Sequence, residues 1–166
     1  MSDTPSIQTR RAGQDDLAEI CRLWRHMMEA HQQLHRDGFA LDRAADNEFL
    51  TYLRDILENY LHAVFVATKN ERVAGYAIVA EMENPSVFAL KRYGFICEIC
   101  VDPALQGGGV GHALFERARR WFERRGLKVV QLNVAPGNQA AMRFYENLGF
   151  QPFLETLWMD LKPPPK

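Results

Sequence analysis

Net charge and long apolar runs are both scarce in this sequence. Its 20 Lys and Arg residues nearly balance 21 Asp and Glu residues, which leaves a formal charge of −1. A chain this close to neutral has no bulk attraction for nucleic acid or an anionic membrane. No apolar run approaches the roughly 20 residues that cross a bilayer, and residues 1–6 show no apolar signal-peptide core. We therefore expect a cytoplasmic protein with no nucleic-acid or membrane partner.

Cysteine is scarce too, with Cys21, Cys97 and Cys100 as the three residues. Three are too few for a disulfide framework. Cys97 and Cys100 have the C-x-x-C spacing of redox and zinc sites, but they lie in an apolar run that predicts a strand. In a regular strand, residues three apart point to opposite faces, so the two sulfurs are expected to diverge. No second Cys or His pair completes a zinc site, so we expect no metal and three small, buried thiols.

What is present is ordinary globular composition, with 47% apolar and 25% charged residues. Apolar periodicity and turn residues predict strand 7–11, helices 14–34 and 42–60, strands 63–68, 72–81 and 93–101, helix 110–125, strand 127–134, helix 139–148 and strand 150–161. This order predicts an α/β (α+β) fold, with a mixed, mostly antiparallel central sheet of about six to seven strands and helices on both faces. We expect one domain over residues 5–162 and a disordered, Pro-rich tail over residues 163–166.

The loop between strand 93–101 and helix 110–125 is crowded with glycine. Its glycines are Gly107, Gly108, Gly109 and Gly111. Glycine lets such a loop curl so that unpaired amides converge at the positive end of a helix, which suits a phosphate or pyrophosphate. No Gly-Lys-Ser/Thr follows, and Leu114 replaces the third glycine of a dinucleotide-binding G-x-G-x-x-G. A nicotinamide-dependent oxidoreductase is therefore the weaker interpretation, and a ligand-free connection also remains open.

From this loop onward the chain resembles the GNAT acyltransferases. Gln106, Gly109 and Gly111 match the family's Gln/Arg-x-x-Gly-x-Gly/Ala loop for acetyl-CoA. A second cofactor-binding segment follows at the separation typical of the family, with matches at Asn133, Val134, Asn138, Ala141, Phe144, Tyr145, Gly149 and Phe150. The resemblance is strong over residues 93–151. It implies a GNAT-like fold and transfer of an acetyl group from acetyl-CoA to an amine.

The resemblance also implies a set of cofactor-binding residues. They are Ile99, Cys100, Val101, Gln106, Gly107, Gly108, Gly109, Val110, Gly111, His112, Asn138 and Tyr145. The loop amides from Gln106 through His112 would hold the pyrophosphate. Backbone groups of Ile99 and Val101 would pair with the pantetheine arm where the fourth and fifth strands separate.

Tyr145 is the candidate general acid, because the resemblance directs its hydroxyl at the departing sulfur. A phenol pKa of ~10 and a thiol pKa of ~8.5 are close enough for proton transfer. The alternative is an aromatic residue that packs beside Phe144.

Glu98 is the candidate general base, acting through a water. It is the one charged residue in the apolar run 95–101, and burial is expected to raise its pKa toward neutrality. The alternative is a structural ion pair with Arg92 or Arg72. Two further acids serve as reserve candidates for the base, Glu81 and Glu83.

Together these residues predict an N-acetyltransferase that moves an acetyl group from acetyl-CoA to a primary amine of a small molecule or peptide, directly and in a ternary complex. A catalytically silent acyl-CoA-binding module is the main alternative. The acceptor's identity stays open, and the resemblance is compatible with a homodimer.

Overall fold

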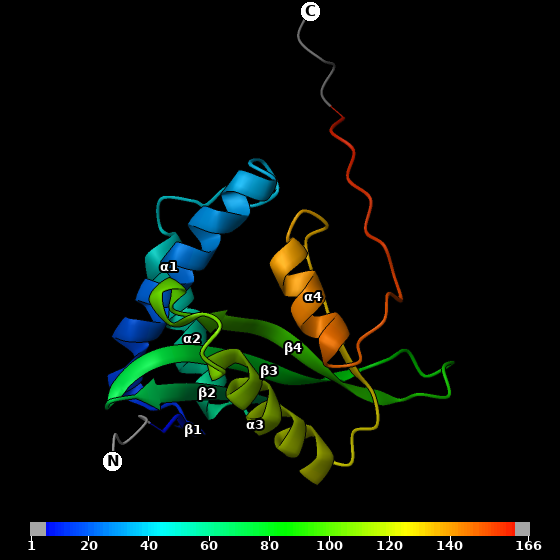
Figure 1. The fold of residues 1–166 in the computed structure, drawn as a ribbon. Helices are drawn as coiled ribbons and strands as arrows, with labels where there is room; N and C mark the ends of the chain where they lie inside the picture. Colours follow the sequence, from blue (N-terminus) through cyan, green and yellow to red (C-terminus); the bar gives the residue numbers. More distant parts are fainter. Residues whose placement is uncertain (1–5, 162–166) are drawn as a thin grey trace, which may run out of the picture. The chain divides into compact units, whose positions relative to one another are not determined.

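The computed structural model describes residues 6–161, which fall into two compact units that divide between Asn133 and Val134. The first unit contains a sheet and three α-helices, and the second contains one helix (Figure 1). Within the described residues, no helix is long and apolar enough to span a bilayer. The predicted tail, residues 163–166, lies outside the described part of the chain, and the single domain over 5–162 stays a prediction.

The sheet of the first unit is mixed and mostly antiparallel, as predicted. Its strands lie in sequence order, and only the last pair is parallel. The strands are β1 Gln8–Arg11, β2 His62–Lys69, β3 Arg72–Glu83, β4 Arg92–Val101 and β5 Val130–Leu132. Asn70 and Glu71 form the tight β2–β3 turn, each with a positive φ, which two-residue hairpins require. The described residues thus contain five strands rather than six to seven.

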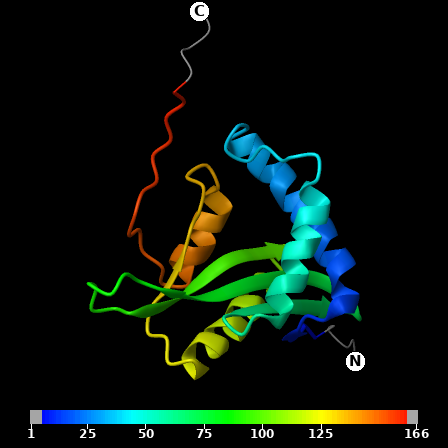
Figure 2. The same cartoon turned by 180° about the vertical axis from the view of Figure 1, so that it is seen from behind.

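Helices cover both faces of this sheet, again as predicted. A short 3-10 turn, Gln14–Asp16, leads into α1 (Leu17–Leu34), which packs with α2 (Ala45–Glu58) on one face (Figure 2). Apolar residues of both helices form one core with the sheet, including Ile20, Leu23, Leu53, Val66, Tyr76 and Ile78, all with no exposed surface. The other face carries α3 (Val110–Arg124).

Two glycines let α3 lie directly on the sheet. A Cβ added at Gly75 would come within 2.6 Å of the Cys100 carbonyl oxygen and 3.1 Å of Val110. At Gly94 it would lie 2.5 Å from the Phe122 ring. Glycine in a strand often marks such a close approach. These contacts fix the start of α3, and with it the glycine-rich loop, against the end of β4.

The fifth strand is shorter than the predicted 127–134 because the end of α3 occupies its first residues. Gly126 adopts a φ of 71°, and Leu127 donates its amide to the Phe122 carbonyl at 3.1 Å. This left-handed helix cap uses the residues just after α3, so pairing with β4 begins only at Val130.

The second unit contains α4 (Gln139–Asn147), followed by residues that form no strand. The predicted strand over 150–161 is therefore wrong. Pro152 cannot donate to a ladder, and the apolar residues of this segment occur in adjacent groups rather than alternating. Leu154 and Leu157 are 80% and 90% exposed.

Candidate active site

Strand β4, which lies between β3 and the edge strand β5, contains a bulge at Cys97. Glu98 pairs with Ile78, and the next pair is Ile96 with Val79, so Cys97 is an extra residue without a cross-strand partner. A bulge shifts the alternation of a strand and can re-aim a neighbouring side chain. Here it lets Cys97 pack against the same core cluster that contains Cys100. The prediction that the two sulfurs diverge is therefore wrong.

The prediction of three buried thiols is confirmed for Cys100 alone. All are free cysteines, Cys100 buried and the other two half-buried. Burial raises the pKa of Cys97 to about 11 and that of Cys100 to about 12, and it also raises the pKa of Cys21. At neutral pH they are therefore protonated and poor nucleophiles.

Beyond the bulge, β4 has an unpaired backbone edge on the β5 side. Gly94 donates its amide to Val129 next to β5, whereas Asp102 donates to Ala74 on β3. Backbone groups alternate in direction along a strand, so Ile99 and Val101 face away from β3 and Cys100 faces it. Pairing between β4 and β5 ends at Ile96 and Leu132. We call the Ile99 and Val101 backbone groups, which have no strand partner among the described residues, the open edge of β4.

The Glu98 side chain projects from the face of the sheet that α1 and α2 cover, the same face as its cross-strand partner Ile78. The Tyr76 hydroxyl donates to its Oε2 atom at 2.7 Å. Burial raises the pKa of Glu98 to about 7, although the hydrogen bond from Tyr76 acts to lower it. The carboxylate therefore exists in both protonation states near neutral pH, as a general base requires.

Glu81, a reserve candidate for the base, has a structural role instead. Its side chain is 4% exposed and accepts hydrogen bonds from Arg92 and from Arg125, the latter at 2.6 Å. Burial acts to raise the pKa of Glu81, but the two arginines outweigh it, so that pKa lies below its usual value. Arg92 thus pairs with Glu81 and not with Glu98.

The glycine-rich loop presents free amides at the start of α3. Gly107 and Gly109 have φ angles of 76° and 86°, a conformation that disfavours side chains. Gly109 is the N-cap residue of α3, and it has no side chain that could cap the helix. The first hydrogen bond of the helix is donated by the Ala113 amide to the Gly109 carbonyl oxygen, at 3.0 Å. The amides of the first turn, those of Val110, Gly111 and His112, therefore have no hydrogen-bond acceptor within the described part of the chain.

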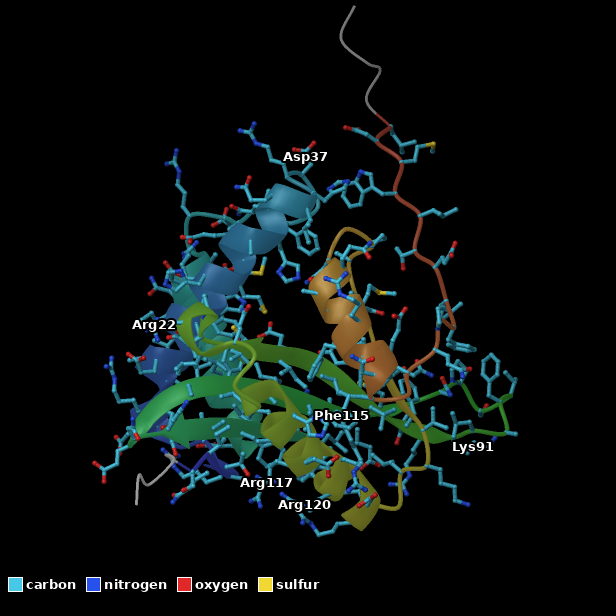
Figure 3. The ribbon with its side chains drawn as sticks, in the orientation of Figure 1. Arg22, Asp37, Lys91, Phe115, Arg117 and Arg120 are labelled. Atoms are coloured by element: carbon cyan, nitrogen blue, oxygen red, sulfur yellow. The ribbon has the colours of Figure 1, made fainter. Side chains whose placement is uncertain are left out.

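An ion pair holds the other end of this loop. Arg22 on α1, labelled in Figure 3, donates to Asp102 at 3.0 Å. The second Asp102 oxygen accepts the Ala104 amide. The hydrogen bond from Arg22 is the main cause of the lowered pKa of Asp102. The loop is thus anchored before its glycines begin.

In the second unit, Asn138 and Tyr145 lie on α4. Asn138 is the N-cap, and its side-chain oxygen accepts the Ala141 amide at 3.1 Å. Tyr145 contacts Phe144 and Phe150 with ring-centre distances of 5.0 and 5.6 Å. Burial raises the pKa of Tyr145 to about 12, so the hydroxyl stays protonated but is less acidic than the sequence argument assumed.

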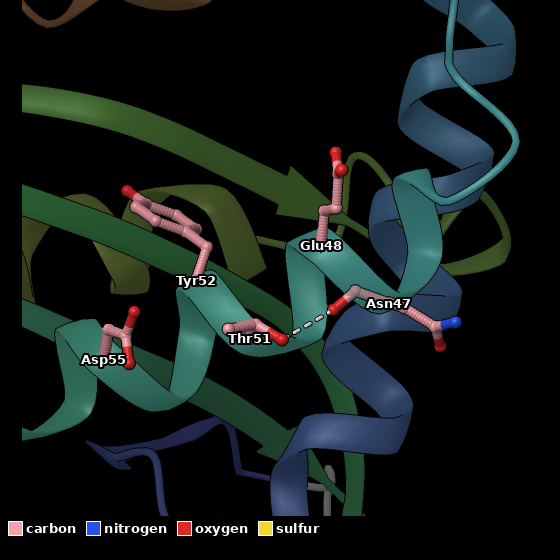
Figure 4. A pocket seen from close by; sticks show the side chains of 5 residues that line it. All are labelled: Asn47, Glu48, Thr51, Tyr52 and Asp55. Carbon is pink, nitrogen blue, oxygen red and sulfur yellow. Dashed lines mark hydrogen bonds between the residues drawn. The ribbon is translucent and has the colours of Figure 1, made fainter.

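A hollow of about 390 Å³ runs along α2 and was not foreseen. It is lined by Asn47, Glu48, Thr51, Tyr52 and Asp55 (Figure 4). Burial raises the pKa of Tyr52 to about 12, with smaller contributions from Cys97 and Glu98. These contributions indicate that Tyr52 on α2 lies close to Cys97 and Glu98 in the bulged part of β4. The described residues contain no group of three potential metal ligands.

Sequence reasoning also missed Tyr76. Its one available signal was a hydroxyl-bearing residue inside the apolar strand 72–81, since a buried hydroxyl needs a partner. The partner could not be named, because it depends on the register between two strands.

Similarity to known proteins identifies the family of this chain. A sequence model of the Acetyltransferase (GNAT) family matches residues 22–150. The chain belongs to the GNAT family. An N-acetyltransferase of Archaeoglobus fulgidus, itself uncharacterised, is 30% identical over 139 residues, which cover 84% of this chain and 89% of that protein. Three further relatives are matched over 29%, 44% and 56% of their own lengths: a mycothiol acetyltransferase of Amycolatopsis mediterranei, an uncharacterised N-acetyltransferase of Methanocaldococcus jannaschii and a ribosomal-protein alanine N-acetyltransferase of Escherichia coli.

Solved GNAT-type structures share the fold. A point mutant of the BH1408 protein from Bacillus halodurans has a TM-score of 0.84 at 23% identity, covering 93% of this chain and 99% of that one. A predicted acetyltransferase with acetyl-CoA from Clostridium acetobutylicum has a TM-score of 0.72 at 22% identity, covering 94% and 97%. These likenesses show the fold, and the family match together with the N-acetyltransferase relatives identifies an acyltransferase enzyme.

Proposed function

We propose that this GNAT enzyme transfers an acetyl group from acetyl-CoA to the primary amine of a small molecule or peptide, directly and in a ternary complex. The observation that carries the proposal is the bulged β4. One short segment supplies a carboxylate with a pKa of about 7 at Glu98 and an open backbone edge at Ile99 and Val101.

The residues of the first unit suit acetyl-CoA. The open edge of β4 offers amide and carbonyl groups that an extended pantetheine arm can pair with, as an added strand does. The free amides at the start of α3 suit the pyrophosphate, because they combine donors with the positive end of a helix dipole. Asn138 and Tyr145 are assigned to the cofactor by the family resemblance.

The chemistry requires two proton movements. The acceptor nitrogen attacks the thioester carbonyl, forming the N–C bond while the C–S bond breaks. Glu98, through a water, takes the proton that the amine loses. Tyr145 gives its hydroxyl proton to the departing sulfur. No covalent enzyme intermediate is needed, which agrees with protonated cysteines.

The hollow on α2 is our candidate acceptor side. Glu48 and Asp55 line it and project from the same side of the helix as Tyr52 (Figure 4). Two carboxylates favour a cationic amine over a neutral one. A screening panel therefore covers polyamines, amino acids, aminoglycoside-like amines and peptide N-termini.

The test measures free coenzyme A thiol released with each amine of the panel. We expect turnover by the wild-type protein, and losses of about 10²–10⁴-fold in kcat for Glu98→Gln and Tyr145→Phe. Tyr60→Phe, which removes an exposed phenol, is the control and keeps wild-type turnover. Acetyl-CoA binding without turnover on any amine, together with no effect of Tyr145→Phe, would instead identify a silent binding module.

A further inference from the structure

We propose that Tyr76 is a positioning residue for Glu98: its hydroxyl holds one carboxylate oxygen and leaves the other to accept the proton of the acceptor amine. This inference rests on the proposed role of Glu98 as general base. It assigns a function to a residue that lies on a different strand from the base and belongs to neither cofactor-binding segment.

The register of β3 and β4 brings the two side chains together. Tyr76 pairs with Cys100 and Glu98 pairs with Ile78, so Tyr76 and Glu98 are diagonal neighbours on one face of the sheet. Diagonal neighbours lie within reach of long side chains. The hydroxyl reaches Oε2 at 2.7 Å, and no other hydrogen bond to this carboxylate is found within residues 6–161.

Tyr76 is built as a fixed donor. Its side chain has no exposed surface and belongs to the core formed by α1, α2 and the sheet. Burial, and then the negative charge of Glu98, raise the pKa of Tyr76 well above its usual value of 10. The hydroxyl is therefore protonated over the pH range in which Glu98 ionises, and its hydrogen bond favours the charged carboxylate.

Among the described residues, no charged group competes with this hydrogen bond. The ionisable groups that face the pair are Tyr52 from α2, Cys97 and Cys100 from β4, and Cys21 from α1. Each has a pKa above its usual value, so all are neutral at pH 7. Within residues 6–161, the Tyr76 hydroxyl is thus the one polar group that favours ionised Glu98, opposing the effect of burial.

The experiment records pH profiles of kcat and kcat/KM for four proteins: wild type, Tyr76→Phe, Glu98→Gln and the double variant. In the wild type we expect activity to rise with pH through about 7 as Glu98 ionises. Loss of the hydrogen bond should move this rise upward by about one pH unit. At pH 7 kcat then falls about fivefold, and at pH 9 it returns close to the wild-type value.

The four profiles separate the two proposals. If Glu98→Gln leaves the rise near pH 7 in place, the assignment of the base is wrong. If Glu98→Gln removes the rise but Tyr76→Phe does not move it, Glu98 stands and the role of Tyr76 is overturned. Tyr76→Phe should cost nothing further in the Glu98→Gln background, because a positioning residue acts through its partner. An equal loss in both backgrounds at every pH would indicate a merely structural hydroxyl.

Discussion

Two glutamates on neighbouring strands show how surroundings decide what a carboxylate does. Glu81 on β3 meets two guanidinium groups, and its pKa lies below the usual value. Glu98 on β4 meets one neutral phenol, and burial raises its pKa to about 7. The same type of side chain is thus a permanent anion at Glu81, where it joins β3 to the end of α3, and a proton acceptor near neutral pH at Glu98.

At this scale we predict that Glu81→Gln lowers the free energy of unfolding by about 1–3 kcal/mol at neutral pH, because Arg92 and Arg125 lose a buried anion. The folded-state pKa of Glu81 is depressed, so its stabilisation is present above the unfolded pKa of ~4.3 and is lost as pH falls through the folded value. Urea unfolding at neutral and acidic pH measures both effects. Glu83→Gln is the matched control, since Glu83 is exposed on the same strand. An equal loss in both variants, or a loss that persists in acid, would contradict the structural role.

At the scale of elements, the loop before α3 combines two requirements. Its backbone must turn through left-handed conformations at Gly107 and Gly109, and its amides must stay free of protein acceptors. The space around the added Cβ positions is open at Gly107 and ordinary at Gly109, where Ile7 lies 3.7 Å away. The need for glycine here is therefore conformational rather than steric.

We predict that Gly109→Ala costs about 1–2 kcal/mol in the native loop conformation, and that relief of this strain displaces the first-turn amides. Affinity for acetyl-CoA should then fall about three- to tenfold by isothermal titration calorimetry. Gly109→Asn should fall less, because Asn tolerates the left-handed region better than Ala. Unchanged affinity in Gly109→Ala would mean that the loop is only a connection.

Across the whole molecule, residue pattern alone predicted the mixed sheet, the helices on both faces and the glycine-rich loop. Alternation and turn residues are local signals, so β2, β3, α1 and α3 lie within a few residues of their predicted bounds. The bulge at Cys97 had no such signal, because one extra residue does not interrupt an apolar run. The Tyr76–Glu98 bond likewise depends on pairing between distant strands, which no single-strand pattern specifies.

A ligand test at this scale uses the full chain. We predict that acetyl-CoA at about 100 times its Kd stabilises the protein by about 2.7 kcal/mol, since binding to the native state alone shifts unfolding. For a chain of this size that corresponds to a rise in Tm of about 5–10 °C. NAD at the same concentration serves as the comparison and should give little change. A larger shift with NAD would favour the oxidoreductase interpretation.

The bulge in β4 has a consequence for how this strand can change over evolution. In β4 the side chains of even-numbered residues point to one face before Cys97 and to the other face after it, because Cys97 is one extra residue in the strand. Deletion of the Cys97 codon would give the whole strand one regular alternation of side chains. Because Ile96 and Glu98 already pair with the adjacent residues Val79 and Ile78, the positions beyond the deletion would keep their faces and their register, and only the bulge would be lost. A deletion elsewhere in β4 would instead move every residue beyond it to the opposite face, so the number of residues can change more readily at Cys97 than at the paired positions of this strand.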